Sequence, residues 1–134
     1  MTRYIKVPSA APPPTSARYS HAVEAQGFLH VTGQLPIDPD APDAALAATI
    51  EEQTELVFRN LKLIVEAAGY ELRNAVLVRI YLSDFERDYI GLNSVYHRYF
   101  DDNEALPART TVGVARLGRA ALVEIEMTLA RSSV

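Results

Sequence analysis

The residues with the clearest chemical potential lie in two short segments near the end of the chain. Arg109 follows Pro107 and Ala108 at the expected entrance of a strand, and Glu124 and Glu126 lie two residues apart inside a later apolar segment. Charged side chains inside an apolar strand are costly unless they are paired or used. The pattern therefore predicts a specific site, of a kind that binds a small anionic molecule.

Each of these charged residues also has a structural interpretation. The guanidinium of Arg109 could hold a carboxylate through two parallel hydrogen bonds, or it could form an internal ion pair with Glu124 or Glu126. Residues two apart in a strand share a face, so both glutamates point to one side, where one of them could act as an acid or base with a raised pKa. The solvated face of an edge strand would explain them equally well, and both alternatives stay open.

Other polar side chains carry weaker signals. Tyr19 offers a hydroxyl at the start of an expected hairpin strand, although tyrosines so placed are mostly core residues. Asn93 lies on an expected helix, where a half-buried amide usually bonds to backbone. The segment at Gly33 lacks the pattern of a phosphate-binding loop, and the three histidines lack the spacing of metal ligands. We therefore expect neither a metal site nor a phosphate-binding loop here.

Length, charge and composition narrow the class of protein. The 134 residues fit a single domain over residues 1–134 with one core. A formal net charge of −4 disfavours nucleic acid or an anionic membrane as partner, because phosphate binding needs clustered Lys and Arg. The chain has no cysteine and no apolar run of the length of a membrane span or signal peptide. We expect a soluble, cytoplasmic protein.

Hydrophobic alternation and turn residues predict six strands. Their expected ranges are residues 1–7, 19–25, 28–32, 75–82, 110–117 and 121–130. Residues 26–27 form the turn of a hairpin, and the chain leaves the sheet at Gly33. The last two strands are expected to form a second hairpin that turns at residues 118–119. Because the 121–130 strand is apolar on both sides, further copies of the chain are expected to cover its second face.

Two helices are expected from the apolar periodicity. The first begins at Thr49, which forms a capping box with Glu52, and ends near Gly69. The second is capped by Asp84 and buries a stripe that includes Tyr96. In the strand between them the buried face is expected to consist of Val76, Val78, Ile80 and Leu82. The order β-β-β-α-β-α-β-β predicts a mixed sheet with both helices on one face.

Several of these segments, in their order along the chain, resemble the Rid family. They are Tyr19-Ser20, Thr32-Gly33-Gln34, Gln53 with Asn60-Leu61, Ala67-Ala68-Gly69, Asn93 with Tyr96 and Phe100, Pro107-Ala108-Arg109, and Val123-Glu124-Ile125-Glu126. This family, also called YjgF/RidA, comprises deaminases of reactive enamine and imine intermediates. The resemblance covers nearly the whole chain. It implies an α+β, chorismate-mutase-like fold and a homotrimer with a central barrel, with sites in the clefts between subunits.

The resemblance also implies roles for individual residues. Arg109 corresponds to the arginine that holds the substrate carboxylate, and Glu124 to the glutamate that orients or activates water. Tyr19, Gly33 and Asn93 match positions that line the cleft. The implied reaction is hydrolysis of a carboxylate-bearing enamine or imine to a 2-oxo acid and ammonia, without a cofactor.

Two positions depart from the family pattern. Thr111 stands where many members carry a cysteine, and Arg18 stands where a proline usually precedes the Tyr-Ser pair. Thr111 keeps a hydroxyl that could bind substrate. The segment 109–112 is closer to members that act on 2-aminomuconate-like compounds, so a deaminase of a degradation pathway is one alternative. A non-catalytic regulatory module that binds a small carboxylate is another, and an RNA-directed role is disfavoured by the net charge.

Overall fold

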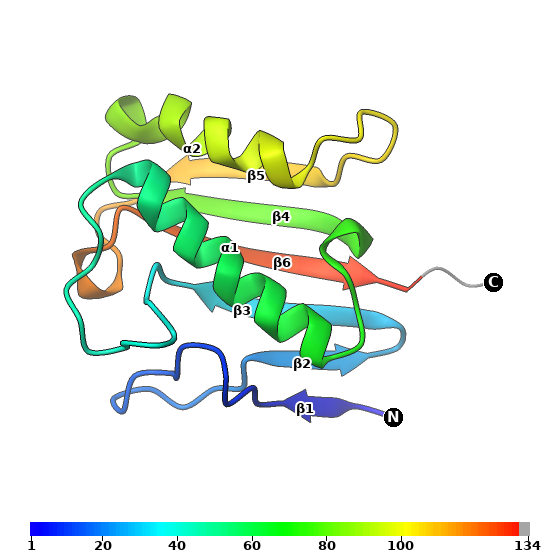
Figure 1. Cartoon of the computed structure of the whole chain (residues 1–134). Helices are drawn as coiled ribbons and strands as arrows, with labels where there is room; N and C mark the ends of the chain where they lie inside the picture. The colour runs from blue at the N-terminus through cyan, green and yellow to red at the C-terminus, as the bar shows by residue number, and fades with distance from the viewer. Residues whose placement is uncertain (132–134) are drawn as a thin grey trace.

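Six strands form one mixed sheet, and two helices cover one of its faces (Figure 1). The strands are β1 (Arg3–Ile5), β2 (Ala22–Ala25), β3 (Phe28–Gln34), β4 (Ala75–Leu82), β5 (Ala108–Gly113) and β6 (Val123–Ala130). The helices are α1 (Ile50–Ala67) and α2 (Phe85–Tyr99), with short 3₁₀ turns η1 (Leu72–Asn74) and η2 (Gly118–Ala120). This computed structural model describes residues 1–131. The strand order across the sheet is β1-β2-β3-β6-β4-β5, and the predicted order of elements along the chain is confirmed.

The helices begin where their caps place them. The Thr49 hydroxyl accepts a hydrogen bond from the backbone amide of Glu52 at 3.1 Å, and the Asp84 carboxylate caps α2 by accepting from the amide of Arg87 at 3.2 Å. The apolar stripe of α1 packs against the sheet, and its Phe58 ring stacks 4.2 Å from the Tyr99 ring of α2. The core therefore lies between the helices and one face of the sheet.

The first hairpin has the predicted turn, but its two strands differ from the predicted ranges at their outer ends. Gln26 and Gly27 have positive φ values of 52° and 81°, as a tight two-residue turn requires. β2 begins only at Ala22, and β3 continues through Gly33 to Gln34, so the expectation that the chain leaves the sheet at Gly33 is wrong. The register between β3 and β6 shifts after Val31, and Gln34 then pairs with Ile125 of β6.

The predicted hairpin between the last two strands is also wrong. β5 ends at Gly113 and pairs in parallel with β4, which α2 connects to it. β6 lies in the middle of the sheet and pairs antiparallel with both β3 and β4. β5 begins at Ala108, two residues before the predicted start, so Arg109 is its second residue.

The buried face of β4 lacks one predicted member. The β4–β6 register shifts between Ala75 and Leu77, and this irregularity turns Val76 outward, where it is 44% exposed. Val78, Ile80 and Leu82 are fully buried, as predicted.

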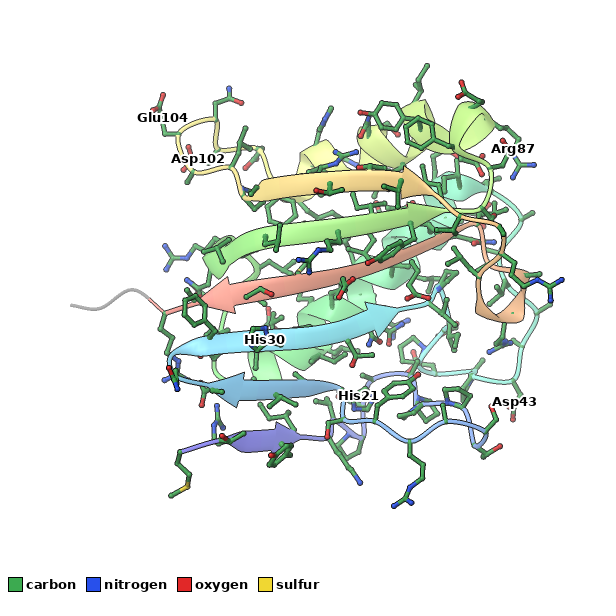
Figure 2. All side chains as sticks on the ribbon, turned by 180° about the vertical axis from the view of Figure 1, so that it is seen from behind. His21, His30, Asp43, Arg87, Asp102 and Glu104 are labelled. Carbon is green, nitrogen blue, oxygen red and sulfur yellow. The ribbon has the colours of Figure 1, made fainter. Side chains whose placement is uncertain are left out.

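The opposite face of the sheet carries no helix within residues 1–131 (Figure 2). Glu124, Glu126 and Thr128 of β6 alternate with buried residues and point to this face, where Arg79 and Tyr81 of β4 lie across from the two glutamates. The predicted open face is therefore present, and it combines charged and apolar groups. No helix in the described part of the chain is long and apolar enough to cross a membrane.

A charged cluster fastens the sheet edge to the end of α1. Glu24 accepts hydrogen bonds from Arg3 Nε at 2.6 Å and from the Tyr70 hydroxyl at 2.5 Å. Arg3 and Arg131 both donate to the carbonyl oxygen of Ala68, at 3.0 and 3.3 Å, where the helix dipole favours cations. The hydrogen bond from Arg3, and next that from Tyr70, lowers the pKa of Glu24 to about 2.

This cluster makes the stability of the fold depend on acid pH. Because folding lowers the pKa of Glu24 from 4.5, its ionised form stabilises the folded state above pH 4.5, and this contribution is lost as pH falls toward 2. We expect Glu24→Gln to lower the melting temperature at pH 7 and to have a smaller effect at pH 3, measured by thermal unfolding. Glu104→Gln, at an exposed loop position, is the control. A deficit that is the same at both pH values would contradict this role.

Candidate functional site

Arg109 and Thr111 lie on the face of the sheet that carries the helices. In the parallel ladder Arg109 is opposite Val78 and Thr111 is opposite Ile80. Both partners are fully buried beneath the helices, and neighbouring paired residues of a sheet share a face. The two side chains of β5 therefore point toward α2.

Neutral groups hold the Arg109 guanidinium. Its Nε donates to the Thr111 hydroxyl at 2.9 Å, and its Nη2 donates to Oδ1 of Asn93 at 2.6 Å. The Arg109 Cζ lies 4.4 Å from the centroid of the Tyr96 ring and 5.8 Å from that of Tyr89. Within residues 1–131 no carboxylate forms an ion pair with Arg109. The guanidinium thus keeps N–H donors for an external anion.

The internal ion pair between Arg109 and Glu124 or Glu126, one of the alternatives left open by the sequence, does not form. The two glutamates lie in β6 and point to the open face, whereas Arg109 points toward α2. β4 also separates β5 from β6 in the sheet. Within one chain, Arg109 and Glu124 cannot contact the same small molecule.

Two other predicted site residues, Gly33 and Tyr19, lie near Glu124. A Cβ atom on Gly33 would overlap the Glu124 carboxylate, so this carboxylate lies directly against the backbone of β3. Tyr19 is close enough that the charge of Glu124 adds to the effect of burial, and both raise the pKa of the Tyr19 hydroxyl. The phenol therefore stays a hydrogen-bond donor at neutral pH.

The surroundings of Glu124 suit proton transfer. Burial raises the pKa of its carboxyl, and the negative charge of Glu126 raises it further. Glu126 itself accepts a hydrogen bond from the Tyr81 hydroxyl, and Tyr81 is the ladder partner of Glu124. A half-buried carboxyl with a raised pKa exchanges protons closer to neutral pH than an exposed one.

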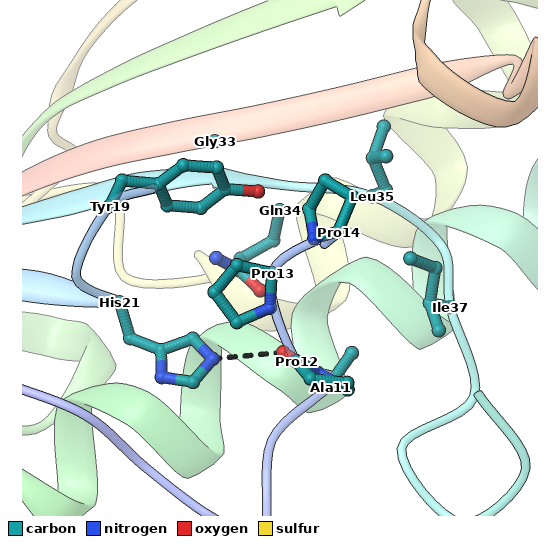
Figure 3. A pocket seen from close by; sticks show the side chains of 10 residues that line it. All are labelled: Ala11, Pro12, Pro13, Pro14, Tyr19, His21, Gly33, Gln34, Leu35 and Ile37. Carbon is teal, nitrogen blue, oxygen red and sulfur yellow. Dashed lines mark hydrogen bonds between the residues drawn. The ribbon is translucent and has the colours of Figure 1, made fainter. Parts of the chain in front are cut away.

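A small cavity lies beside Tyr19 and Gly33 (Figure 3). The Pro-rich loop, His21 and the end of β3 form its other walls. Its volume of about 20 Å³ is enough for a single water molecule but too small for a substrate. A substrate-sized molecule therefore does not fit inside this cavity.

The six predicted site residues thus fall into two groups on opposite faces of the sheet. We call Arg109, Asn93 and Thr111 the carboxylate half and Glu124, Tyr19 and Gly33 the water half, after the roles that we propose for them below.

The sequence did not single out Tyr89 as a neighbour of Arg109. Its signal is present in the helical period, because Tyr89, Asn93 and Tyr96 are spaced four and three residues apart and share one face of α2. That face is the one in contact with Arg109.

Comparison with known proteins finds a matching family model, similar sequences and similar solved structures. The family model described as Endoribonuclease L-PSP matches residues 9–131. A RutC family protein of Pyrococcus horikoshii is 44% identical over 108 residues, which cover 81% of this chain and 82% of that protein. The crystal structure of RidA from an Antarctic Psychrobacter matches with a TM-score of 0.85 at 34% identity, over 96% of this chain and 99% of that one. The structure of E. coli TdcF with bound serine matches with a TM-score of 0.87 at 29% identity, over 97% and 99%.

Proposed function

Because the chain belongs to the Endoribonuclease L-PSP family, which includes RidA and YjgF, we propose that it hydrolyses a carboxylate-bearing enamine or imine. The products are a 2-oxo acid and ammonia. The observation that carries this proposal is Arg109, a permanent cation held only by neutral groups within the described chain. Serine bound to the similar E. coli TdcF is likewise a small carboxylate. The nuclease of the family description fits less well, since a net charge of −4 disfavours RNA.

Catalysis of this hydrolysis requires an oriented substrate, a proton donor and acceptor, and a water molecule positioned for attack. An enamine takes up a proton from solvent on carbon to become an iminium ion, and water adds to the iminium carbon. The C–N bond then breaks as the C=O bond forms, the hydroxyl proton is lost to solvent and ammonia leaves. Arg109 binds the carboxylate, and Glu124 accepts a proton from the attacking water and returns it to nitrogen. Tyr19 and Thr111 donate hydrogen bonds to the substrate, while Asn93 orients the guanidinium and Gly33 leaves room for the Glu124 carboxylate.

A complete site then needs two copies of the chain. We propose a homotrimer in which Arg109 of one subunit and Glu124 of its neighbour face each other across a cleft. The separation of these residues on opposite faces of the sheet supports this assembly, as does the open face with its half-buried Leu77 and Leu122.

Light scattering tests the assembly directly. We expect a particle of about 44 kDa, three times the chain mass of 14.8 kDa, at micromolar concentration. A stable monomer would contradict both the trimer and the shared site.

The reaction is tested by forming 2-aminoacrylate in situ with a dehydratase and following the release of pyruvate. The same assay is repeated with 2-aminomuconate. Faster hydrolysis of 2-aminomuconate alone would favour the alternative suggested by the segment around Thr111, a deaminase of 2-aminomuconate-type compounds. A carboxylate that binds but is recovered unchanged would favour a regulatory module. No acceleration and no binding would refute the proposal.

A further inference from the structure

Residues 7–11 form neither strand nor helix, yet buried polar contacts fix their backbone. The amide of Val7 donates to Nδ1 of His21 at 2.9 Å, and Nε2 of His21 lies 2.8 Å from the carbonyl oxygen of Ala11 (Figure 3). Since Nδ1 accepts the amide hydrogen, the imidazole carries its own hydrogen on Nε2 and donates it to Ala11. Both ring nitrogens of this buried, neutral histidine are therefore used by the loop.

The same loop is held from the opposite side by Asn60 of α1. Its Oδ1 accepts from the Ala11 amide at 2.8 Å, and its Nδ2 donates to the carbonyl oxygens of Ile37 at 2.7 Å and Leu56 at 3.2 Å. Asn60 is fully buried in the apolar stripe of α1, where an amide is costly unless every polar group is bonded. Its contacts with two separate loops provide that compensation.

These contacts converge on the water half of the candidate site. Pro12, Pro13 and Pro14, which follow Ala11, line the cavity together with Tyr19 and Gly33. In Figure 3 the Pro13 ring lies between the side chains of Tyr19 and His21. The Tyr19 side chain is 40% exposed and forms no side-chain hydrogen bond within residues 1–131. Tyr19 shares the cavity wall with the three prolines, and its hydroxyl is close enough to Glu124 for the charge of that carboxylate to add to burial in raising the pKa of this hydroxyl.

We propose that His21 and Asn60 are positioning residues for the hydrolytic site. They hold Ala11 by its carbonyl and its amide, which sets the wall of Pro12, Pro13 and Pro14 and, through it, the place of the Tyr19 hydroxyl. His21 is not an acid or base in this role, because both of its nitrogens are bonded to backbone groups. The inference rests on the proposed function, in which Tyr19 hydrogen-bonds the substrate.

The kinetic test compares His21→Leu with His21→Gln. Leucine removes both hydrogen bonds, whereas glutamine keeps a donor and an acceptor. With 2-aminoacrylate we expect His21→Leu to lower kcat about tenfold, the usual effect of one misplaced hydrogen bond, and to leave KM within about twofold because Arg109 is untouched. His21→Gln should restore most of kcat. Thr54→Val, which removes a buried hydroxyl of α1 that bonds only within the helix, controls for a general loss of stability.

A double variant shows whether His21 acts through Tyr19. If it does, His21→Leu combined with Tyr19→Phe should be no slower than Tyr19→Phe alone. Multiplicative losses, or an unchanged kcat in His21→Leu, would overturn the inference while leaving the deaminase assignment intact. Should His21→Leu fail to fold, Asn60→Ala removes the other contact of Ala11 and is measured in the same way.

A structural readout separates the inference from the proposed function. Hydrogen exchange of the Ala11 amide should be faster in His21→Leu and Asn60→Ala than in the parent protein and in Thr54→Val, whether or not the protein turns over 2-aminoacrylate. Unchanged exchange of the Ala11 amide would overturn the role of His21 and Asn60 in holding Ala11. An inactive parent protein with accelerated exchange in the variants would instead refute the proposed function, and with it the role of Tyr19.

Discussion

Replacement of Arg109 by alanine is expected to lower kcat/KM for a carboxylate-bearing imine by about 10²–10³-fold. The variant loses the charge-assisted, two-pronged hydrogen bonding to the substrate carboxylate, which no other cation in the carboxylate half replaces. Its melting temperature should stay within a few degrees of the parent value, because Asn93 and Thr111 are only half-buried and water can replace the guanidinium. Steady-state kinetics and thermal unfolding of the same preparation measure both effects.

The expected split between activity and stability distinguishes a binding role from a structural one. If Arg109 were half of a buried ion pair, its removal would cost about 3–5 kcal/mol and lower the melting temperature strongly. Arg109→Lys keeps the charge but loses the planar fork, and should recover only part of the affinity. Arg98→Ala removes an exposed arginine of the same helix layer that pairs with Glu55, and should leave kcat/KM unchanged. A variant of Arg109 that is unstable yet fully active would refute the proposed role.

The sequence predicted the helices and most strands because their signals are local. The cap of Thr49 and Glu52 and the alternation of residues 75–82 depend only on neighbours along the chain. Arg109 and Glu124 could be singled out for the same reason, since they interrupt apolar strands, whereas Gly33, Asn93 and Thr111 were selected through the family resemblance. Alternation also placed Glu124 and Glu126 on one face.

Strand pairing could not be predicted, because it depends on contacts between distant segments. Residues 118–119 look like a hairpin turn, but the Arg119 guanidinium donates to the carbonyl oxygens of Pro42 at 2.7 Å and Ala44 at 2.8 Å. These bonds fasten the segment to a loop more than 70 residues earlier in the chain, and β6 then enters the sheet between β3 and β4. The placement of Arg109 and Glu124 on opposite faces follows from the registers of β5 and β6 with β4.

The position of Gly33 illustrates a further limit. Its function in the structure is the space that its missing side chain leaves for the Glu124 carboxylate, a residue 91 positions later in the sequence. A single glycine between polar neighbours reads as a break in a strand, and only the β3–β6 register shows that it is a close approach.

Glu124→Gln is expected to lower kcat by about 10²–10³-fold, because an amide cannot accept the proton of the attacking water. KM should change little, since the carboxylate of the substrate binds to Arg109. Gly33→Ala offers an independent variant, because its Cβ would displace the Glu124 carboxylate while Glu124 itself is retained. Rate measurements at saturating substrate test both, and a Glu124→Gln protein with full kcat would exclude this glutamate from the reaction.

The pH profile of kcat/KM tests whether Glu124 is the group that titrates. Only its ionised form accepts a proton, so kcat/KM should fall as pH drops through its raised pKa, at a higher pH than an ordinary carboxyl would give. The charge of Glu126 contributes to that raised pKa. Glu126→Gln removes this charge, lowers the pKa of Glu124 and should therefore move the acid limb to lower pH. A limb that moves upward or stays in place would assign the titration to another group.

Mixing the two inactive variants decides whether Arg109 and Glu124 act across a subunit boundary. An Arg109→Ala subunit still supplies Glu124, and a Glu124→Gln subunit still supplies Arg109, so a cleft between them can hold both native residues. Random mixed trimers refolded from equal amounts should then recover up to about a quarter of the parent activity, because that fraction of clefts is intact. If both residues of a site came from one chain, every cleft would lack one of them and no activity would return. Separately refolded variants, combined without exchange of subunits, provide the control.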